Sequence, residues 1–293
     1  MLSGLGEASA SGSDEALVYD SLEQAGMKDQ WSHVLAQTQR FQSFGFMVVM
    51  IMGGVIYDVR FVQKATDLFG MSLDATKAMI LRWPIYLTLL TSLGTLYVAA
   101  RFTEPKSHRE TNEPPKIGET IKQTWQAEKW IGRTPFALIV IVAGAFADSV
   151  IRMFITLGSE YYRLIDFSSF YLGFIAAGIS GISIFTATFS KWLVDKRSPT
   201  FIFYVISAIA LVGFFGAKFF IPYYGVIFSV LLFTAFSITM FAVSYYLNHI
   251  TEKTMRATVL SFKSLAFNLG YGLIGWLYAM LGYYLRENPS LAD

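Results

Sequence analysis

The 293-residue sequence contains no cysteine and only three histidines, His33, His108 and His249. Without cysteine the chain cannot form a disulfide bond or a thiolate metal site. The histidines are too scattered to match the spacing of a metal-binding motif. A GxSxG elbow and a Walker loop are also absent, which removes the sequence basis for a hydrolase or an ATPase. We therefore expect neither a cofactor nor a metal, and no enzymatic activity.

Charged residues are also scarce. They make up 15% of the chain, whereas soluble globular proteins contain about 25%. Hydrophobic residues reach 54%, and the mean hydropathy is +0.47. A soluble fold of this size could not bury so much apolar surface. The composition predicts an all-α, polytopic transmembrane helical bundle in a lipid bilayer, and the net charge of +2 is too small to indicate a nucleic-acid partner.

Seven stretches of the sequence are long enough and poor enough in charge to cross a membrane as helices. A bilayer core requires about 20 predominantly apolar residues per helix. The sixth stretch exceeds one perpendicular span, and Pro222 and the polar Asn248 shorten it to one tilted helix. The stretches are residues 41–57, 83–100, 134–159, 167–190, 198–217, 219–251 and 264–285.

The first 22 residues are rich in small side chains and admit two interpretations. Gly4, Ala8 and Gly12 recur every four residues, so one helical face could approach a neighbour closely. The same composition is typical of a flexible Gly/Ser leader. A signal peptide is excluded, because the segment lacks a basic start and an apolar centre. We interpret it as the latter part of a membrane helix, which brings the total to about eight helices.

A polar linker divides the predicted helices into two groups. Residues 103–132 combine three prolines with many charges, which indicates a solvated connection with a short amphipathic helix at 117–130. Residues 1–102 would then form a partial N-terminal bundle, and residues 133–293 a C-terminal bundle that lacks its last helix. The loops on the side of the linker carry about twice as many Lys and Arg residues as the opposite loops. The linker is therefore expected on the cytoplasmic side.

Four stretches resemble the major facilitator superfamily. GEASASGSDEALVYDSL at 6–22, ADSVIRMFITLGSEYYRLI at 147–165 and RATVLSFKSLAFNLGYGL at 256–273 are similar to the fourth, seventh and eleventh helices of a poorly characterised bacterial branch. KWLVDKRSP at 191–199 resembles the family's acidic-basic loop. The resemblance implies a fragment that covers helices four to eleven. It also implies a gradient-driven secondary transporter of a small solute in the bacterial cytoplasmic membrane, working by alternating access with a proton or another ion as a coupling partner.

Asp148 and Arg152 are the charges most deeply placed in a predicted span. A charge at mid-membrane costs about 2.5–3.5 kcal/mol on insertion scales. The presence of this pair within a span therefore needs a structural or functional explanation. The two residues lie four apart on one helical face, which Thr156 and Ser159 extend. They could form a cavity face, or a self-neutralised pair that joins helices. The resemblance favours the first, because the family's seventh helix lines its central cavity; Arg152 would hold an anion, and Asp148 would be protonatable.

Further polar stripes complete the candidate site. Glu7, Ser11, Asp14 and Glu15 share a helical face, on which we expect Asp14 to be solvated. A second stripe leads from Thr234 to Asn248, and a third from Ser261 to Asn268; each should face protein or water rather than lipid. Lys263 is expected to extend to the membrane surface. The predicted substrate or coupling-ion residues are Asp148, Arg152, Glu15, Glu7, Asn248 and Asn268.

Other interpretations fit the sequence less well. Gly270, Gly272 and Gly275 spell GxGxxG, but they lie in an apolar helix, where close packing is the expected role rather than dinucleotide binding. A non-transporting membrane scaffold or a receptor-like bundle is the alternative function, and its charges would form static pairs. A membrane-embedded enzyme is disfavoured, because catalytic His or paired acids do not cluster at one face.

Overall fold

The computed structural model describes residues 12–56, 63, 67–68, 82–101 and 117–288. All regular structure in these residues is helical, which confirms the expected all-α fold. Short 3-10 turns occur at Lys28–Gln30 and Ser169–Tyr171. The helices are α2 (Ser13–Gln24), α3 (Trp31–Ile56), α6 (Trp83–Ala99), α7 (Ile117–Arg133), α8 (Pro135–Thr156), α9 (Gly158–Leu164), α10 (Leu172–Lys196), α11 (Pro199–Ala217), α12 (Val226–Ile250) and α13 (Arg256–Glu287).

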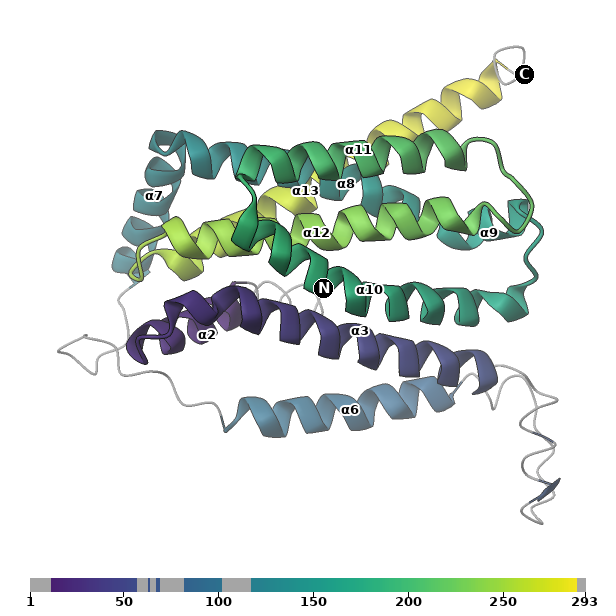
Figure 1. Ribbon diagram of the computed structural model, residues 1–293, viewed down its shortest axis with the longest axis horizontal. Coiled ribbons are helices and arrows are strands. Elements are labelled where there is room, and N and C mark those ends of the chain that lie inside the picture. Colours follow the sequence, from purple (N-terminus) through teal and green to yellow (C-terminus); the bar gives the residue numbers. More distant parts are fainter. Residues whose placement is uncertain (1–11, 57–62, 64–66, 69–81, 102–116, 289–293) are drawn as a thin grey trace.

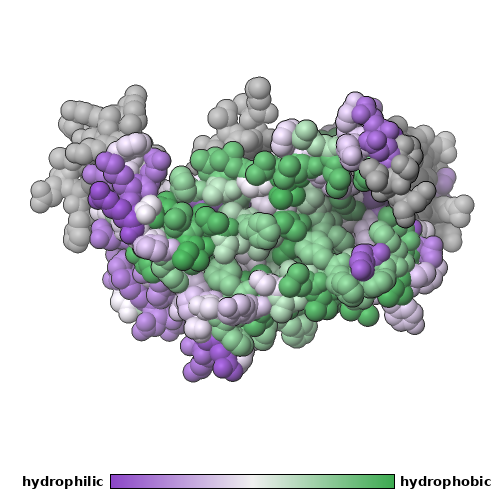
Figure 2. Space-filling view, turned by 90° about the horizontal axis from the view of Figure 1, so that it is seen from above, coloured by the Kyte–Doolittle hydropathy of each residue, from purple (hydrophilic) through white to green (hydrophobic). Residues whose placement is uncertain are grey.

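The long helices run side by side and form one elongated bundle (Figure 1). Among the described residues, α8, α10, α11, α12 and α13 are long and apolar enough to cross a membrane, and α6 contains a shorter apolar segment, Ile85–Ala99. Figure 2 shows a broad hydrophobic band between two more polar ends. Lipid can cover such a band, because the backbone polar groups of a helix are satisfied within the helix.

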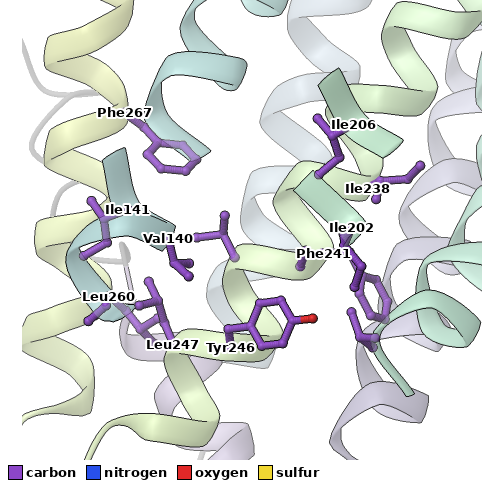
Figure 3. Packing of buried hydrophobic residues seen from close by; sticks show 14 of the residues in the cluster. Val140, Ile141, Ile202, Ile206, Ile238, Phe241, Tyr246, Leu247, Leu260 and Phe267 are labelled. Atoms are coloured by element: carbon purple, nitrogen blue, oxygen red, sulfur yellow. The ribbon is translucent and has the colours of Figure 1, made fainter. Parts of the chain in front are cut away.

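The core of the bundle lies around α12. This helix packs against α8, α10 and α11, while α3 packs along α10 and α8 along α13 (Figure 1). Apolar side chains from most of the described helices meet in the interior, and Figure 3 shows part of this cluster from close by. The largest contributors are Val140 and Ile141 of α8, Ile202 and Ile206 of α11, Ile238, Phe241 and Leu247 of α12, and Leu260 and Phe267 of α13.

Two predicted helix starts are corrected by the structure. The span expected from Phe41 begins ten residues earlier, because α3 starts at Trp31. The span expected from Ser264 begins at Arg256, the first residue of α13. Both helices extend through charged or polar residues that have partners on other helices, as Arg40 has in the Thr188 hydroxyl at 2.6 Å. The uncharged stretches of the sequence therefore predict the start of each of these two helices too late.

Two other spans also have boundaries that differ from the sequence prediction. The stretch 134–159 is divided, because α8 ends at Thr156 and the short helix α9 follows. The stretch 219–251 becomes helical only at Val226, since Phe220 and Tyr223 before it have positive φ angles of 46° and 57°. Non-glycine residues rarely adopt such angles, and they are incompatible with a continuous helix.

The beginning of α2 is held close to α13. Gly12 precedes α2 and has a φ of 79°, which favours glycine. A Cβ atom at this position would lie 2.8 Å from the Cβ atom of Leu260. Gly12 thus makes the expected close approach, but it precedes α2 and does not lie on a helical face; Gly4 and Ala8 lie outside the described residues.

Candidate functional site

A cavity of about 790 Å³ lies between α2 and α3 on one side and α8, α9, α10 and α12 on the other. Pockets of this size accommodate small organic molecules. Most of the lining is apolar, and aromatic side chains come from both sides. Its polar contributions come mainly from amides and hydroxyls: Thr38, Gln39, Gln42, Ser43, Ser159, Tyr162, Ser180, Ser183, Ser237 and Ser244.

Glu15 lies at the edge of this cavity and connects three helices. Its carboxylate accepts hydrogen bonds from the Ser244 hydroxyl at 2.5 Å and from Asn248 Nδ2 at 3.3 Å, both on α12. The ammonium group of Lys263, on α13, lies 3.4 Å from the other carboxylate oxygen. The structure thus brings together Glu15 and Asn248, two of the predicted site residues that are 233 positions apart.

The expected position of Lys263 is wrong. The side chain does not extend to the membrane surface, because the residue is only 6% exposed and its ammonium group faces Glu15. A buried charge requires a partner, and this partner belongs to a helix at the other end of the chain. The sequence does place this lysine within an apolar stretch. That position was interpreted as a side chain that extends to the membrane surface, and the alternative of a buried ion pair was not considered.

A second group of charges joins α2 to the turn between α12 and α13. Arg256 is 3% exposed and forms ion pairs with Asp20 and, at 3.4 Å, with Glu23. Its guanidinium group also donates to the Thr251 carbonyl at 2.9 Å and lies 4.3 Å from the centre of the Tyr19 ring. Sequence reasoning did not select Arg256, because its acidic partners are more than 230 positions away.

The same end of the bundle carries another ion pair, between the last turn of α2 and the 3-10 turn that follows it. The Lys28 ammonium group lies 2.5 Å from the Glu23 carboxylate. This contact raises the pKa of Lys28 above its ordinary value. Glu23 therefore has cationic partners on both sides, Lys28 and Arg256.

Asp148 and Arg152 form the ion pair that their spacing predicts, with 2.6 Å between the charged atoms. Arg152 also donates to Asn268 Oδ1 at 3.1 Å, and its guanidinium group lies 5.4 Å from the centre of the Tyr271 ring. Thr156 and Tyr271 share a hydrogen bond of 3.0 Å. Three predicted site residues thus meet, but at the contact between α8 and α13 and not on the cavity lining. Their role in substrate or ion binding stays a prediction, and Glu7 lies outside the described residues.

The predicted stripe on α12 divides between two environments. Ser237, Phe241 and Ser244 line the cavity, and Asn248 contacts Glu15 beside it. Gln39 of α3 donates a hydrogen bond to Ser237 from across the cavity. The contribution of α3 was not predicted, because its glutamines and serines carry no charge and do not stand out in a scan for unusual membrane residues.

Comparison with known protein families decides the class of the chain. A family model described as Major Facilitator Superfamily matches residues 27–275. The chain belongs to the major facilitator superfamily. No curated protein and no solved structure matches it.

Membership of the major facilitator superfamily makes this a membrane transporter rather than an enzyme at the level of the family. It is a multi-pass membrane protein whose partners are the lipid bilayer and a small molecule. The matched residues begin just before α3 and end within α13, so they include most of the helices that surround the cavity. The family assignment and the cavity therefore concern the same part of the molecule.

Proposed function

We propose that the chain is the body of a gradient-driven secondary transporter, and that the 790 Å³ cavity binds its small solute. The observation that carries this proposal is the position of the cavity. It lies between helices that precede the linker, α2 and α3, and helices that follow it, α8 to α10 and α12. Rocking of one group against the other would expose the cavity to each side of the membrane in turn. The proposed location is the bacterial cytoplasmic membrane.

Glu15 is the proposed coupling residue. Its carboxylate is partly buried, and its partners Ser244, Asn248 and Lys263 all belong to the helices that follow the linker. Protonation would remove its attraction to Lys263 and weaken the hydrogen bonds that it accepts. Uptake of a proton would thus loosen α2 from α12 and α13, which links occupancy of the site to movement of the helices.

Asp148, Arg152 and Asn268 are proposed as a second coupling or binding group. Asp148 is completely buried, and its Oδ2 atom has no hydrogen-bond partner among the described residues. Arg152 retains partial exposure, with 28% of its side chain accessible. An ion that reached Arg152 would compete with Asp148 for the guanidinium group, and it would thereby change the contact between α8 and α13.

Cysteine accessibility tests alternating access without knowledge of the solute. The chain has no native cysteine, so a Ser180→Cys substitution in the lining introduces a single thiol. In sealed vesicles of known orientation, a membrane-impermeant maleimide should label this thiol from either side. Tyr224→Cys, in the exposed connection between α11 and α12, is the matched control and should be labelled from one side alone. Labelling of the cavity thiol from only one side under every gradient would indicate the alternative, a static scaffold.

A further inference from the structure

We infer that the cavity takes a monovalent organic cation with an apolar body, an inference that rests on the proposed function. The charged side chains on the lining decide the sign. Among the described residues, Asp14 and Glu15 are the charged members of the lining, and no Lys, Arg or His belongs to it. A cavity bordered by charges of one sign and apolar walls concentrates ions of the opposite sign.

Internal pairing neutralises only part of this charge. Lys263 lies behind Glu15, at 3.4 Å from its carboxylate, and does not line the cavity. Asp14 accepts a hydrogen bond from the backbone of Glu15 at 2.8 Å and forms no ion pair within the described part of the chain. One carboxylate therefore remains without a cationic partner there, and an anionic solute would be repelled.

The remainder of the lining fits the body of such a cation. Phe46, Trp31, Tyr162, Phe236 and Phe241 place aromatic rings on both sides of the cavity. The faces of aromatic rings attract cations, and this attraction is strongest in tryptophan. The same rings present apolar surface to hydrocarbon groups of the solute, so charge and apolar surface are recognised together.

Among the described residues, Trp31 Nε1 and Gln39 Oε1 are buried atoms of the lining residues and have no hydrogen-bond partner. Trp31 is 2% exposed, and its Nε1 donor makes no hydrogen bond among the described residues. Gln39 donates from Nε2 to Ser237, which leaves its Oε1 as an unused acceptor. Buried polar atoms are nearly always satisfied in proteins. A solute hydroxyl group could accept from Trp31 and donate to Gln39, whereas a solute N–H group could supply only the donor for Gln39.

The sign of the recognised charge can be measured with two thiol reagents of similar size. Ser183→Cys places the only thiol on the lining, and the Tyr224→Cys thiol outside the cavity serves as reference. The reagents are the cationic 2-(trimethylammonium)ethyl and the anionic 2-sulfonatoethyl methanethiosulfonate, applied to both sides of the membrane. We expect the cation-to-anion rate ratio to be about tenfold higher at the Ser183→Cys thiol than at the reference, because the carboxylates on the lining attract the cationic reagent and repel the anionic one.

Substitution of Asp14 tests whether its carboxylate is the cause of the higher cation-to-anion rate ratio. In the Ser183→Cys background, Asp14→Asn should lower the ratio at least threefold, because it removes the unpaired charge. The matched control is Asp195→Asn, whose carboxylate pairs with Lys191 near the end of α10 and does not line the cavity. This control should leave the ratio unchanged. Asp14 is exposed, so the substitution should not disturb folding.

Protection by a matched pair of bulky ions completes the test. Tetraphenylphosphonium should slow labelling of the Ser183→Cys thiol, whereas tetraphenylborate, of the same shape and opposite charge, should not. Equal rates for both reagents, or protection by the borate alone, would overturn the assignment of a cation and leave the transport cavity intact. If neither reagent labels the thiol from either side of the membrane, water does not reach the cavity. Both the proposed transport function and the assignment of a cation would then be wrong.

Discussion

Lys263 lies in an apolar stretch of α13, and its ammonium group is buried against the carboxylate of Glu15. The pair joins the first described helix to the last one. A buried ion pair contributes little net stability over an apolar replacement, but removal of one partner leaves an uncompensated charge. At the scale of single residues, the two side chains therefore depend on each other.

Substitution of either residue alone should destabilise the protein more than substitution of both. Lys263→Met leaves Glu15 without its cation, and we expect a loss of about 1–3 kcal/mol, less than for a fully buried pair because Glu15 is partly exposed. The double variant Lys263→Met and Glu15→Gln should recover part of this loss. Melting temperatures of the detergent-purified single and double variants measure the coupling. Additive effects would show that the contact is not energetically significant.

The glycines of α13 test the packing between α8 and α13. A Cβ atom at Gly270 would lie 2.5 Å from the hydroxyl oxygen of Ser149, whereas one at Gly275 would meet no atom within 4 Å. Gly270→Ala should therefore lower the melting temperature, at a cost of about 1–3 kcal/mol for overpacking. Gly275→Ala, the matched control in the same motif, should be neutral or stabilising, since alanine favours helix by about 1 kcal/mol. Equal effects of the two substitutions would contradict the packing.

At the scale of elements, the contact of α2 with the turn between α12 and α13 is a candidate for the contact that closes one end of the cavity. Arg256 provides most of it, through Asp20, Glu23 and the carbonyl group of Thr251. The loops at this end of the bundle carry the larger share of Lys and Arg, which predicts the cytoplasmic side for it. The contact therefore holds the two groups of helices together at one end of the cavity.

Loss of this contact should open the cavity toward the cytoplasm. Arg256→Gln, or the milder Asp20→Asn, should raise the cytoplasmic labelling rate of the Ser180→Cys thiol about tenfold, which corresponds to a shift of about 1.4 kcal/mol between two conformations. Arg286→Gln, an exposed arginine at the far end of α13, is the control and should have no effect. An unchanged rate in both closure variants would exclude a gating role for Arg256.

The sequence predicted the helices themselves far better than their boundaries or the cavity. Apolar runs identify a helix without knowledge of its neighbours, and each of the seven predicted spans corresponds to a helix of the described chain. Boundaries failed where a charge is neutralised by a distant partner, as at Arg256 and Arg40. The cavity could not be predicted, because it depends on which faces of α3, α10 and α12 meet, and one sequence does not contain this information.

At the scale of the whole molecule, the distribution of charge predicts the orientation in the membrane. The turns after α2, α10 and α12 lie at the same end of the bundle as α7, and α9 and the connection between α11 and α12 lie at the opposite end (Figure 1). This arrangement agrees with the alternation of sides that the sequence requires. The apolar band between the ends, visible in Figure 2, corresponds to the membrane.

Single cysteines at the two ends test this orientation. Lys253→Cys, between α12 and α13, should be labelled by an impermeant maleimide only from the cytoplasmic side, and Tyr224→Cys only from the outside. Labelling of both thiols from the same side would contradict the bundle topology, since α12 would then not cross the membrane. Reversed sides would preserve the topology and overturn the orientation inferred from Lys and Arg.

The close approach at Gly12 has a mechanical consequence for α2. At this point α2 cannot come closer to α13, because even a single added carbon would collide with Leu260. We therefore expect Gly12 to be the point about which α2 tilts. Asp20 lies eight residues from Gly12 along α2, or about 12 Å at 1.5 Å per residue. A tilt of α2 by about 10° at Gly12 would move Asp20 by about 2 Å, enough to separate it from Arg256, and would move Glu15 relative to Lys263 by less than half as much.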